Sequence, residues 1–188
     1  QIARLIASTG SFSGFDAAIH GFGPVHAGAI QKTMKMLDRG IKLEKEMGWG
    51  PKETAHHLYK EFEQNGERIP GFGHRYHSAD PRPKRIIEMA KGYGIAGPHV
   101  ELAMELNDLF YEEKGIRMNV DGGNGSCLMD MGFPWTAGNI VFMIGRSPGL
   151  IAHEWEELTS EKPFSHKMTI LYTGKKEREI PARYGKKS

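Results

Sequence analysis

Apolar residues return every three or four positions through most of this chain, in segments separated by glycine and proline. A helix with one buried face has this spacing, because 3.6 residues make one turn. The pattern predicts helices at residues 1–20, 24–38, 51–65, 85–91, 100–115 and 134–158. It also predicts an extended segment at 116–121, a Gly-rich loop after it, an interruption of the last helix at 145–149 and an extended tail beyond residue 159.

The length and composition exclude several classes of protein. A chain of 188 residues can bury one core, or one core plus a small lobe. It is 39% hydrophobic and 26% charged, which is ordinary for a soluble globular protein. No apolar run approaches the roughly 18 residues of a membrane span. The net charge of +2 gives no field that would attract nucleic acid, so neither a membrane nor a nucleic acid is expected as a partner.

The cysteine content and the start of the chain bear on its context. Cys127 is the only cysteine, so no intramolecular disulfide can form, which favours a reducing, cytoplasmic setting. The chain starts at Gln1 with no signal-peptide pattern. We therefore expect a fragment or a trimmed chain.

The segment 69–82 concentrates two histidines, two arginines and an aspartate between turn-forming proline and glycine residues. Arg75 and Arg82 could each offer a carboxylate a bidentate fork, and His74 could donate to a carbonyl or an alkoxide between them. The alternative is a solvated surface turn, and this segment alone leaves both interpretations open.

Three further residues are candidates for chemistry. His26 follows a Gly-Pro break near the start of a predicted helix, where free backbone N–H groups point at any ligand, although a structural role fits as well. Asp121 lies between an extended and a Gly-rich segment, as a general base or as a cap or turn former. Arg146 lies among glycine, serine and proline between apolar flanks and should have an anionic partner.

Three short motifs do not match the binding sites that they first suggest. The Gly-x-Gly-x-x-Gly run at 92–97 follows a helix rather than a strand, so it is no dinucleotide site. The His-Glu start at 153–157 lacks the second histidine of a zinc protease. His56 and His57 are adjacent on a helix and point in different directions, so they are no metal pair. The sequence supports neither a metal nor a redox cofactor.

The glycine-bounded motifs at 23–29, 71–82 and 119–122, followed by Gly145-Arg146-Ser147, resemble the citrate synthase superfamily in order and separation. The resemblance extends to residues 171–174, which are similar to that family's C-terminal strand. It implies an all-α, two-lobed fold that works as a homodimer with its site between the lobes. Residues 1–45 would belong to the large lobe, 46–145 to the small, CoA-side lobe, and 146–188 would return to the large lobe. The family's upstream helices would be missing.

The resemblance also implies roles for individual residues. His26 would hydrogen-bond the thioester oxygen of acetyl-CoA, His74 would act on the carbonyl or hydroxyl oxygen of the four-carbon partner, and Asp121 would exchange the methyl proton. The substrate-binding set would be Arg75, Arg82, Arg146 and Lys162. Coenzyme A, as part of the substrate, would lie near the backbone of Pro70, Gly71, Phe72 and Gly73.

Two departures from the synthase pattern direct the choice of reaction. Asp121 is followed by Gly-Gly-Asn-Gly, which looks more like citryl-CoA lyases and the C-terminal lyase module of ATP-citrate lyase. Lys162 stands where the synthases place an arginine contributed across the dimer, and a lysine neutralises a carboxylate only as a point charge. The leading hypothesis is cleavage of citryl-CoA to acetyl-CoA and oxaloacetate. The alternatives are a citrate or 2-methylcitrate synthase and a non-catalytic CoA-binding module.

Overall fold

The computed structural model describes residues 1–23, 27–74, 79–164 and 171–175, and within these ranges every regular element is a helix. The only extended pairings found there are two isolated bridges, Gly23 with Ala27 and Phe72 with Met118. The prediction of an all-α fold is confirmed for these ranges. The elements are α1 (Ile2–Ala7), α2 (Gly14–His20), α3 (Ala29–Met47), α4 (Pro51–Gln64), α5 (Pro81–Gly92), α6 (Pro98–Lys114), α7 (Val120–Asp130), η1 (Trp135–Ala137) and α8 (Gly138–Ser160).

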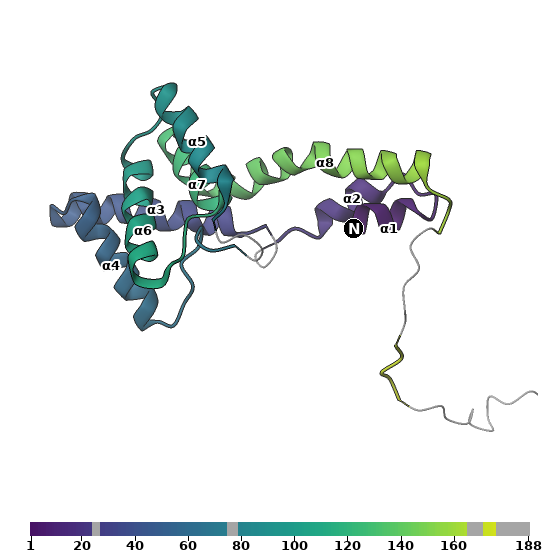
Figure 1. Cartoon of the computed structure of the whole chain (residues 1–188), viewed down its shortest axis with the longest axis horizontal. Helices are drawn as coiled ribbons and strands as arrows, with labels where there is room; N and C mark the ends of the chain where they lie inside the picture. Colours follow the sequence, from purple (N-terminus) through teal and green to yellow (C-terminus); the bar gives the residue numbers. More distant parts are fainter. Residues whose placement is uncertain (24–26, 75–78, 165–170, 176–188) are drawn as a thin grey trace, which may run out of the picture.

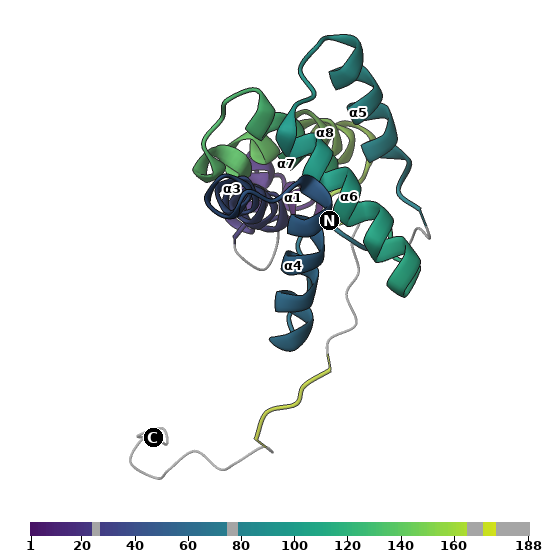
Figure 2. The same ribbon diagram turned by 90° about the vertical axis from the view of Figure 1, so that its left-hand side faces the viewer.

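The helices form two groups joined by α8 (Figure 1). In one group α4 packs on α6, and α7 packs on α3, α5 and α6. After a turn of 90° about the vertical axis, α7 lies between α3 and the pair α5 and α6 (Figure 2). In the other group α1 and α2 pack against α8, which runs away from α7 as a long rod. The lobe boundaries expected at 45/46 and 145/146 stay a prediction.

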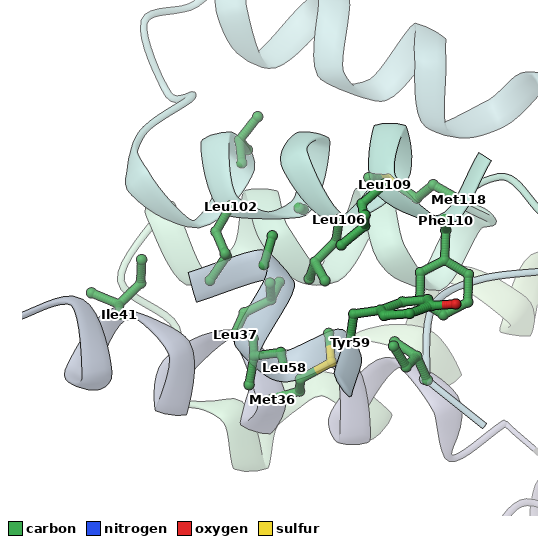
Figure 3. Close-up of a cluster of buried hydrophobic side chains, with 14 of the residues drawn as sticks. Met36, Leu37, Ile41, Leu58, Tyr59, Leu102, Leu106, Leu109, Phe110 and Met118 are labelled. Atoms are coloured by element: carbon green, nitrogen blue, oxygen red, sulfur yellow. The ribbon is translucent and has the colours of Figure 1, made fainter. Parts of the chain in front are cut away.

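The main core lies where α3, α4 and α6 meet (Figure 3). Leu37, Leu58, Leu102 and Leu106 are completely buried there. Burying a leucine side chain stabilises a fold by about 1.5–3 kcal/mol, so this cluster fixes the three helices to one another. The sequence signals at the helix ends agree, since α4 and α6 each begin with proline and α6 ends at Gly115 with φ +66°.

Helix α7 is the largest difference from the sequence prediction, which placed an extended segment and a loop here. A Cβ on Gly122 would overlap Met118 and lie 2.6 Å from the Gly71 carbonyl oxygen, and one on Gly123 would lie 3.0 Å from Pro83. Gly125 faces α3. The glycines therefore let α7 approach its neighbours at backbone distance, and this packing outweighs their poor helix propensity.

Other predicted boundaries were also wrong. The first predicted helix is two, because residues 8–13 interrupt it, with Gly10 at φ +81°. Helix α3 continues nine residues past 38, to Met47. The stretch 145–149 does not interrupt α8, which contains Pro148 in its interior. Residues 171–174 form no strand in the part of the tail that is described.

Two carboxylates of α8 attach α1 and α2 to it. Glu154 accepts hydrogen bonds from the backbone N–H groups of Gly14 at 3.1 Å and Phe15 at 2.7 Å, at the start of α2. The buried Glu157 accepts from Nε of Arg4 at 2.9 Å. The acidic residues of the rejected zinc-protease motif are therefore structural.

Candidate active site

The site is built around Asp80, the residue before α5. Its carboxylate accepts from the backbone N–H of Arg82 at 3.0 Å, from Nε and Nη2 of Arg82 at 2.9 and 2.8 Å, and from the backbone N–H of Val120 at 2.9 Å. Its side chain is 1% exposed. Burial alone would raise the pKa of Asp80, but the hydrogen bonds and charge of Arg82 and the Val120 N–H lower it to about 2. Asp80 thus fixes Arg82 and joins α5 to α7.

Arg82 is held on one edge only. Its Nε and Nη2 form a fork on the Asp80 carboxylate, while the side chain remains 48% exposed. Nη2 also lies 3.4 Å from Nε2 of His74, and because a guanidinium only donates, Nε2 is the acceptor in this contact. The sequence predicts that Arg82 offers a fork to a ligand. Because one edge of the guanidinium already binds Asp80, only the edge that points away from Asp80 remains for a ligand.

Asn119 connects the His74 loop to Asp121. Its side-chain oxygen caps α7 by accepting from the backbone N–H groups of Asp121 at 2.9 Å and Gly122 at 3.4 Å. Its amide nitrogen donates to the carbonyl of Gly73 at 2.8 Å, and its backbone N–H donates to that of Gly71 at 2.9 Å. One side chain therefore holds the residue before His74 and the backbone of Asp121 in a single arrangement.

Asp121 lies in the first turn of α7 and is partly buried. Burial raises the pKa of its carboxyl group and the charge of Asp80 adds to this, whereas the charges of Arg82 and Arg146 oppose it. The net direction of the pKa shift is upward, which favours the protonated carboxyl group relative to an exposed aspartate. Asp121 lies at a helix start and also carries a partly buried carboxyl group with a raised pKa, so its structural interpretation does not exclude the catalytic one.

Arg146 projects from α8 with its guanidinium carbon 5.0 Å from the ring centre of Phe142. It is exposed, and its charge acts on Asp121. The structure therefore brings Arg82, His74, Asp121 and Arg146 into one neighbourhood, with two cations around a partly buried carboxyl group.

A cavity of about 670 Å³ opens beside His74. Phe72 and Gly73 line it, together with a wall in which Phe110 stacks on Phe72, with ring centres 5.2 Å apart, and meets Tyr59 edge-on at 5.1 Å. Its remaining lining includes two cations, Arg68 and Lys114. The volume and the aromatic wall suit a flat organic group.

A groove of about 640 Å³ adjoins this cavity and shares Phe62, Glu67 and Arg68 with it. It is rich in cations, with Lys32, Lys35, Arg39 and Arg68 among its lining residues, and it includes Pro70. Arg39 is paired with Glu61, and Lys35 lies 5.1 Å above the ring of Trp135. The groove offers a binding surface for an anion.

Gly71 plays a different part from its neighbours in the loop. It lines neither opening, and its φ of +88° suits glycine. A Cβ there would lie 2.7 Å from Oγ1 of Thr33. Its contribution is the close packing of the loop onto α3 and α7.

The remaining predicted site residues differ in whether the structure describes them. His26 and Arg75 lie outside the described residues. Lys162 is exposed and follows the end of α8 that points away from α7 (Figure 1). Because α8 has 23 residues and is about 35 Å long, Lys162 is remote from His74 and Asp121 within one chain.

Asp80 and Asn119 were given no role by the sequence reasoning. Asp80 precedes proline at the start of a helix, and Asn119 stands two residues before Asp121; both are typical N-cap residues. Cap preference could have found each helix start, but only the fold reveals the second partner of each side chain.

Among the described residues, no group of three or more His, Cys, Asp and Glu side chains could hold a metal ion. No helix in the described ranges is long and apolar enough to cross a membrane.

A model of the C-terminal domain of citrate synthase matches residues 1–168. The chain belongs to the citrate synthase family. The citrate synthases of Corynebacterium glutamicum and Haloferax volcanii are 30% and 31% identical to it over 170 and 159 residues. These alignments cover 86% and 82% of this chain but only 38% and 39% of those proteins, so the chain spans less than half the length of these relatives.

Solved structures of the family share the fold. The citryl-CoA lyase of Hydrogenobacter thermophilus superposes with a TM-score of 0.84 at 35% identity, covering 98% of this chain and 73% of that one. The citrate synthase of Thermotoga maritima superposes with a TM-score of 0.73 at 26% identity, covering 97% of this chain and 50% of that one. The family therefore includes both lyases and synthases among the relatives of this chain.

Proposed function

We propose that this chain carries the site of a citryl-CoA lyase, which cleaves citryl-CoA to acetyl-CoA and oxaloacetate. The observation that carries the proposal is Asp121, a partly buried carboxyl group with a raised pKa on which the charges of Arg82 and Arg146 act, and which Asn119 links to the His74 loop. The likeness to the Hydrogenobacter thermophilus lyase over 98% of the chain supports cleavage as the direction.

The reaction needs one group to take a proton from oxygen and another to give a proton to carbon. His74 would remove the proton of the citryl hydroxyl group, so that the carbon–carbon bond breaks to give the ketone of oxaloacetate and the enolate of acetyl-CoA. Asp121 would then protonate the enolate carbon to give the methyl group. Arg82 and Arg146 would hold the carboxylates of the four-carbon part, and His26 would stabilise the charge on the thioester oxygen.

The cavity beside His74 is the proposed site of the CoA moiety. CoA combines a flat adenine ring with several phosphate charges, and the aromatic wall of Phe72, Phe110 and Tyr59 suits the ring. The basic groove next to it would lie along the phosphates, with Lys32 and Arg68 as the cations for which no carboxylate partner is found among the described residues.

We also propose that the working form is a homodimer. Helix α8 exposes four large apolar side chains, Ile140, Ile144, Ile151 and Trp155, each 54–69% exposed. Such a row along one helix is typical of a surface that another chain covers. A second copy would also supply Lys162 to the opposite site.

Sedimentation velocity tests this proposal. The unaltered protein should sediment as a dimer, Trp155→Glu should dissociate that dimer, and Lys60→Glu, on the exposed side of α4, should leave the dimer intact.

A citrate or 2-methylcitrate synthase is the second candidate, because the curated relatives matched over 82–86% of the chain are citrate synthases. A synthase would condense an acyl-CoA with oxaloacetate and hydrolyse the thioester. Of the two candidates only the synthase releases free CoA, so free CoA distinguishes them.

The experiment offers the protein both sets of substrates. With citryl-CoA, the lyase proposal predicts release of oxaloacetate, followed through malate dehydrogenase and NADH, and loss of that release in His74→Ala. Release of free CoA from acetyl-CoA plus oxaloacetate would contradict the lyase proposal and support the synthase. CoA binding without turnover in either assay would contradict both and indicate a non-catalytic CoA-binding module.

A further inference from the structure

A second cavity, of about 530 Å³, is lined by residues of α5 and α6 and by Arg117 and Met118 of the segment between α6 and α7. It shares no lining residue with the cavity beside His74 or with the basic groove. Its volume is within the range of small-molecule sites, which is about 300–1,000 Å³. The proposed lyase reaction makes no use of it.

The floor of this cavity is apolar. Ile87 and Met118 are buried, at 6% and 4% exposure, and Met104 and Pro83 complete the surface. The polar groups there already have partners, because Oδ1 of Asn107 accepts from the backbone N–H of Met118 at 2.9 Å and the carboxylate of Asp80 accepts four hydrogen bonds. A ligand that reaches the floor must therefore be apolar at that end.

The rim is basic. Lys84 and Lys91 lie seven residues apart on one face of α5, and Arg117 lies across from them with its guanidinium carbon 3.5 Å from the ring centre of Tyr111. The one acidic residue of the rim, Glu88, lies 3.9 Å from Arg85. Neither lysine has an ion-pair partner among the described residues, and Arg82 neutralises Asp80. An anionic head group at the rim would meet a net positive charge.

We propose that this cavity binds an amphipathic carboxylate, with its hydrocarbon tail on Ile87, Met104 and Met118 and its carboxylate at Lys84 and Lys91. The apolar floor selects the tail, and the two ammonium groups, which have no ion-pair partner in the described ranges, select the charge. Asp80 lines this cavity but not the one beside His74, and the proposal does not depend on which reaction the chain catalyses.

The test is an NMR titration of the protein labelled with [13C-methyl]methionine, using octanoate as the probe. The methyl groups of Met104 and Met118 should shift saturably, while those of Met47 and Met131, which are 56% and 53% exposed, should not. Octan-1-ol, which has the tail without the charge, should bind at least tenfold more weakly. Acetate, which has the charge without the tail, should cause no shift at Met104 or Met118.

A charge-reversal variant provides the matched control. Lys84→Glu/Lys91→Glu should weaken octanoate at least tenfold and leave octan-1-ol within about twofold, whereas Lys60→Glu should change neither. An unchanged methyl resonance of the fully buried Met34 verifies the fold of each variant. The proposal is wrong if octanoate produces no saturable shift, shifts the exposed methionines equally, or binds the charge-reversed variant as well as the unaltered protein.

Discussion

Asp80 and Arg82 are joined by three hydrogen bonds, two of which form a fork between the carboxylate and the guanidinium at 2.9 and 2.8 Å. The same carboxylate accepts from the backbone of Val120 at 2.9 Å. The residue that orients a proposed substrate-binding arginine therefore also fixes the start of the helix that carries Asp121. Stability and activity should consequently depend on the same side chain.

Asp80→Asn should lower the free energy of unfolding by about 1–3 kcal/mol at pH 7, because an amide cannot replace a buried carboxylate that accepts from a guanidinium. The estimate stays below the cost for a fully buried pair, since Arg82 is half exposed. Urea denaturation measures it. Arg85→Ala, which removes only an exposed pair 3.9 Å long, should stay within about 0.5 kcal/mol. Equal effects of the two variants would contradict the role of Asp80.

The pKa of Asp80 also predicts how stability responds to acid. A carboxyl group whose folded pKa is about 2, against an ordinary value of 3.8, adds stability that is present above pH 4 and is lost as the pH falls towards 2. The loss amounts to about 2 kcal/mol, at about 1.4 kcal/mol per unit. Urea titrations at several pH values should show this loss in the unaltered protein and not in Asp80→Asn.

Asp130 gives the control for this acid dependence. Its pKa is also lowered, mainly through hydrogen bonds from His99, Val100 and Gly97 that oppose the effect of its burial. Asp130→Asn should therefore retain the part of the acid slope that Asp80 contributes. If Asp130→Asn and Asp80→Asn lost the same part of the acid dependence, the assignment of that part to Asp80 would be wrong.

Asn119→Ala should lower the free energy of unfolding by about 1–2 kcal/mol, because it removes the side-chain cap of α7. Asn119→Ser keeps a capping oxygen but cannot reach the Gly73 carbonyl, so it should recover most of that stability without recovering activity. Thermal unfolding and turnover, measured on both variants, separate the effect of the helix cap from the effect of the hydrogen bond that links Asn119 to the Gly73 carbonyl. Full activity in Asn119→Ser would show that the link to Gly73 does not position the site.

Gly122→Ala should destabilise the fold by about 1–3 kcal/mol, since its Cβ would overlap Met118 and lie 2.6 Å from the Gly71 carbonyl oxygen. Gly92→Ala, in the last turn of α5 with no atom within 4 Å of its Cβ, should instead raise stability by up to about 1 kcal/mol. Urea denaturation of the pair tests whether close packing explains the glycines of α7. A stabilising Gly122→Ala would contradict it.

Much of this fold follows from local sequence signals, and the exceptions have physical causes. Helices α4 and α6 were predicted closely because apolar spacing marks their buried faces and, for α4, because Pro51 signals the start. Helix α7 was missed because glycine has low helix propensity in isolation, whereas here Gly122 and Gly123 are required by contacts with residues far away in sequence. Pro148 suggested a break in α8, but the helix accommodates it on an exposed stretch.

The candidate site was predictable in part. The motif resemblance pointed to His74, Arg82, Asp121 and Arg146, and the structure gathers these four. The contacts of Asp80 with Val120 and of Asn119 with Gly73 span 40 and 46 residues, so no local pattern could reveal them. The roles themselves, including those of His26, Arg75 and Lys162, stay predictions for experiment.

The most direct test of the proposed chemistry compares oxaloacetate release from citryl-CoA by the unaltered protein and by Asp121→Asn. General acid–base catalysis contributes about 10²–10⁴-fold, so the rate should fall at least a hundredfold while CoA affinity stays within about threefold. Stability at pH 7 should not decrease, because burial disfavours the charge that the substitution removes. A variant that releases oxaloacetate at the unaltered rate would contradict the assignment of Asp121 as the acid that protonates the enolate carbon.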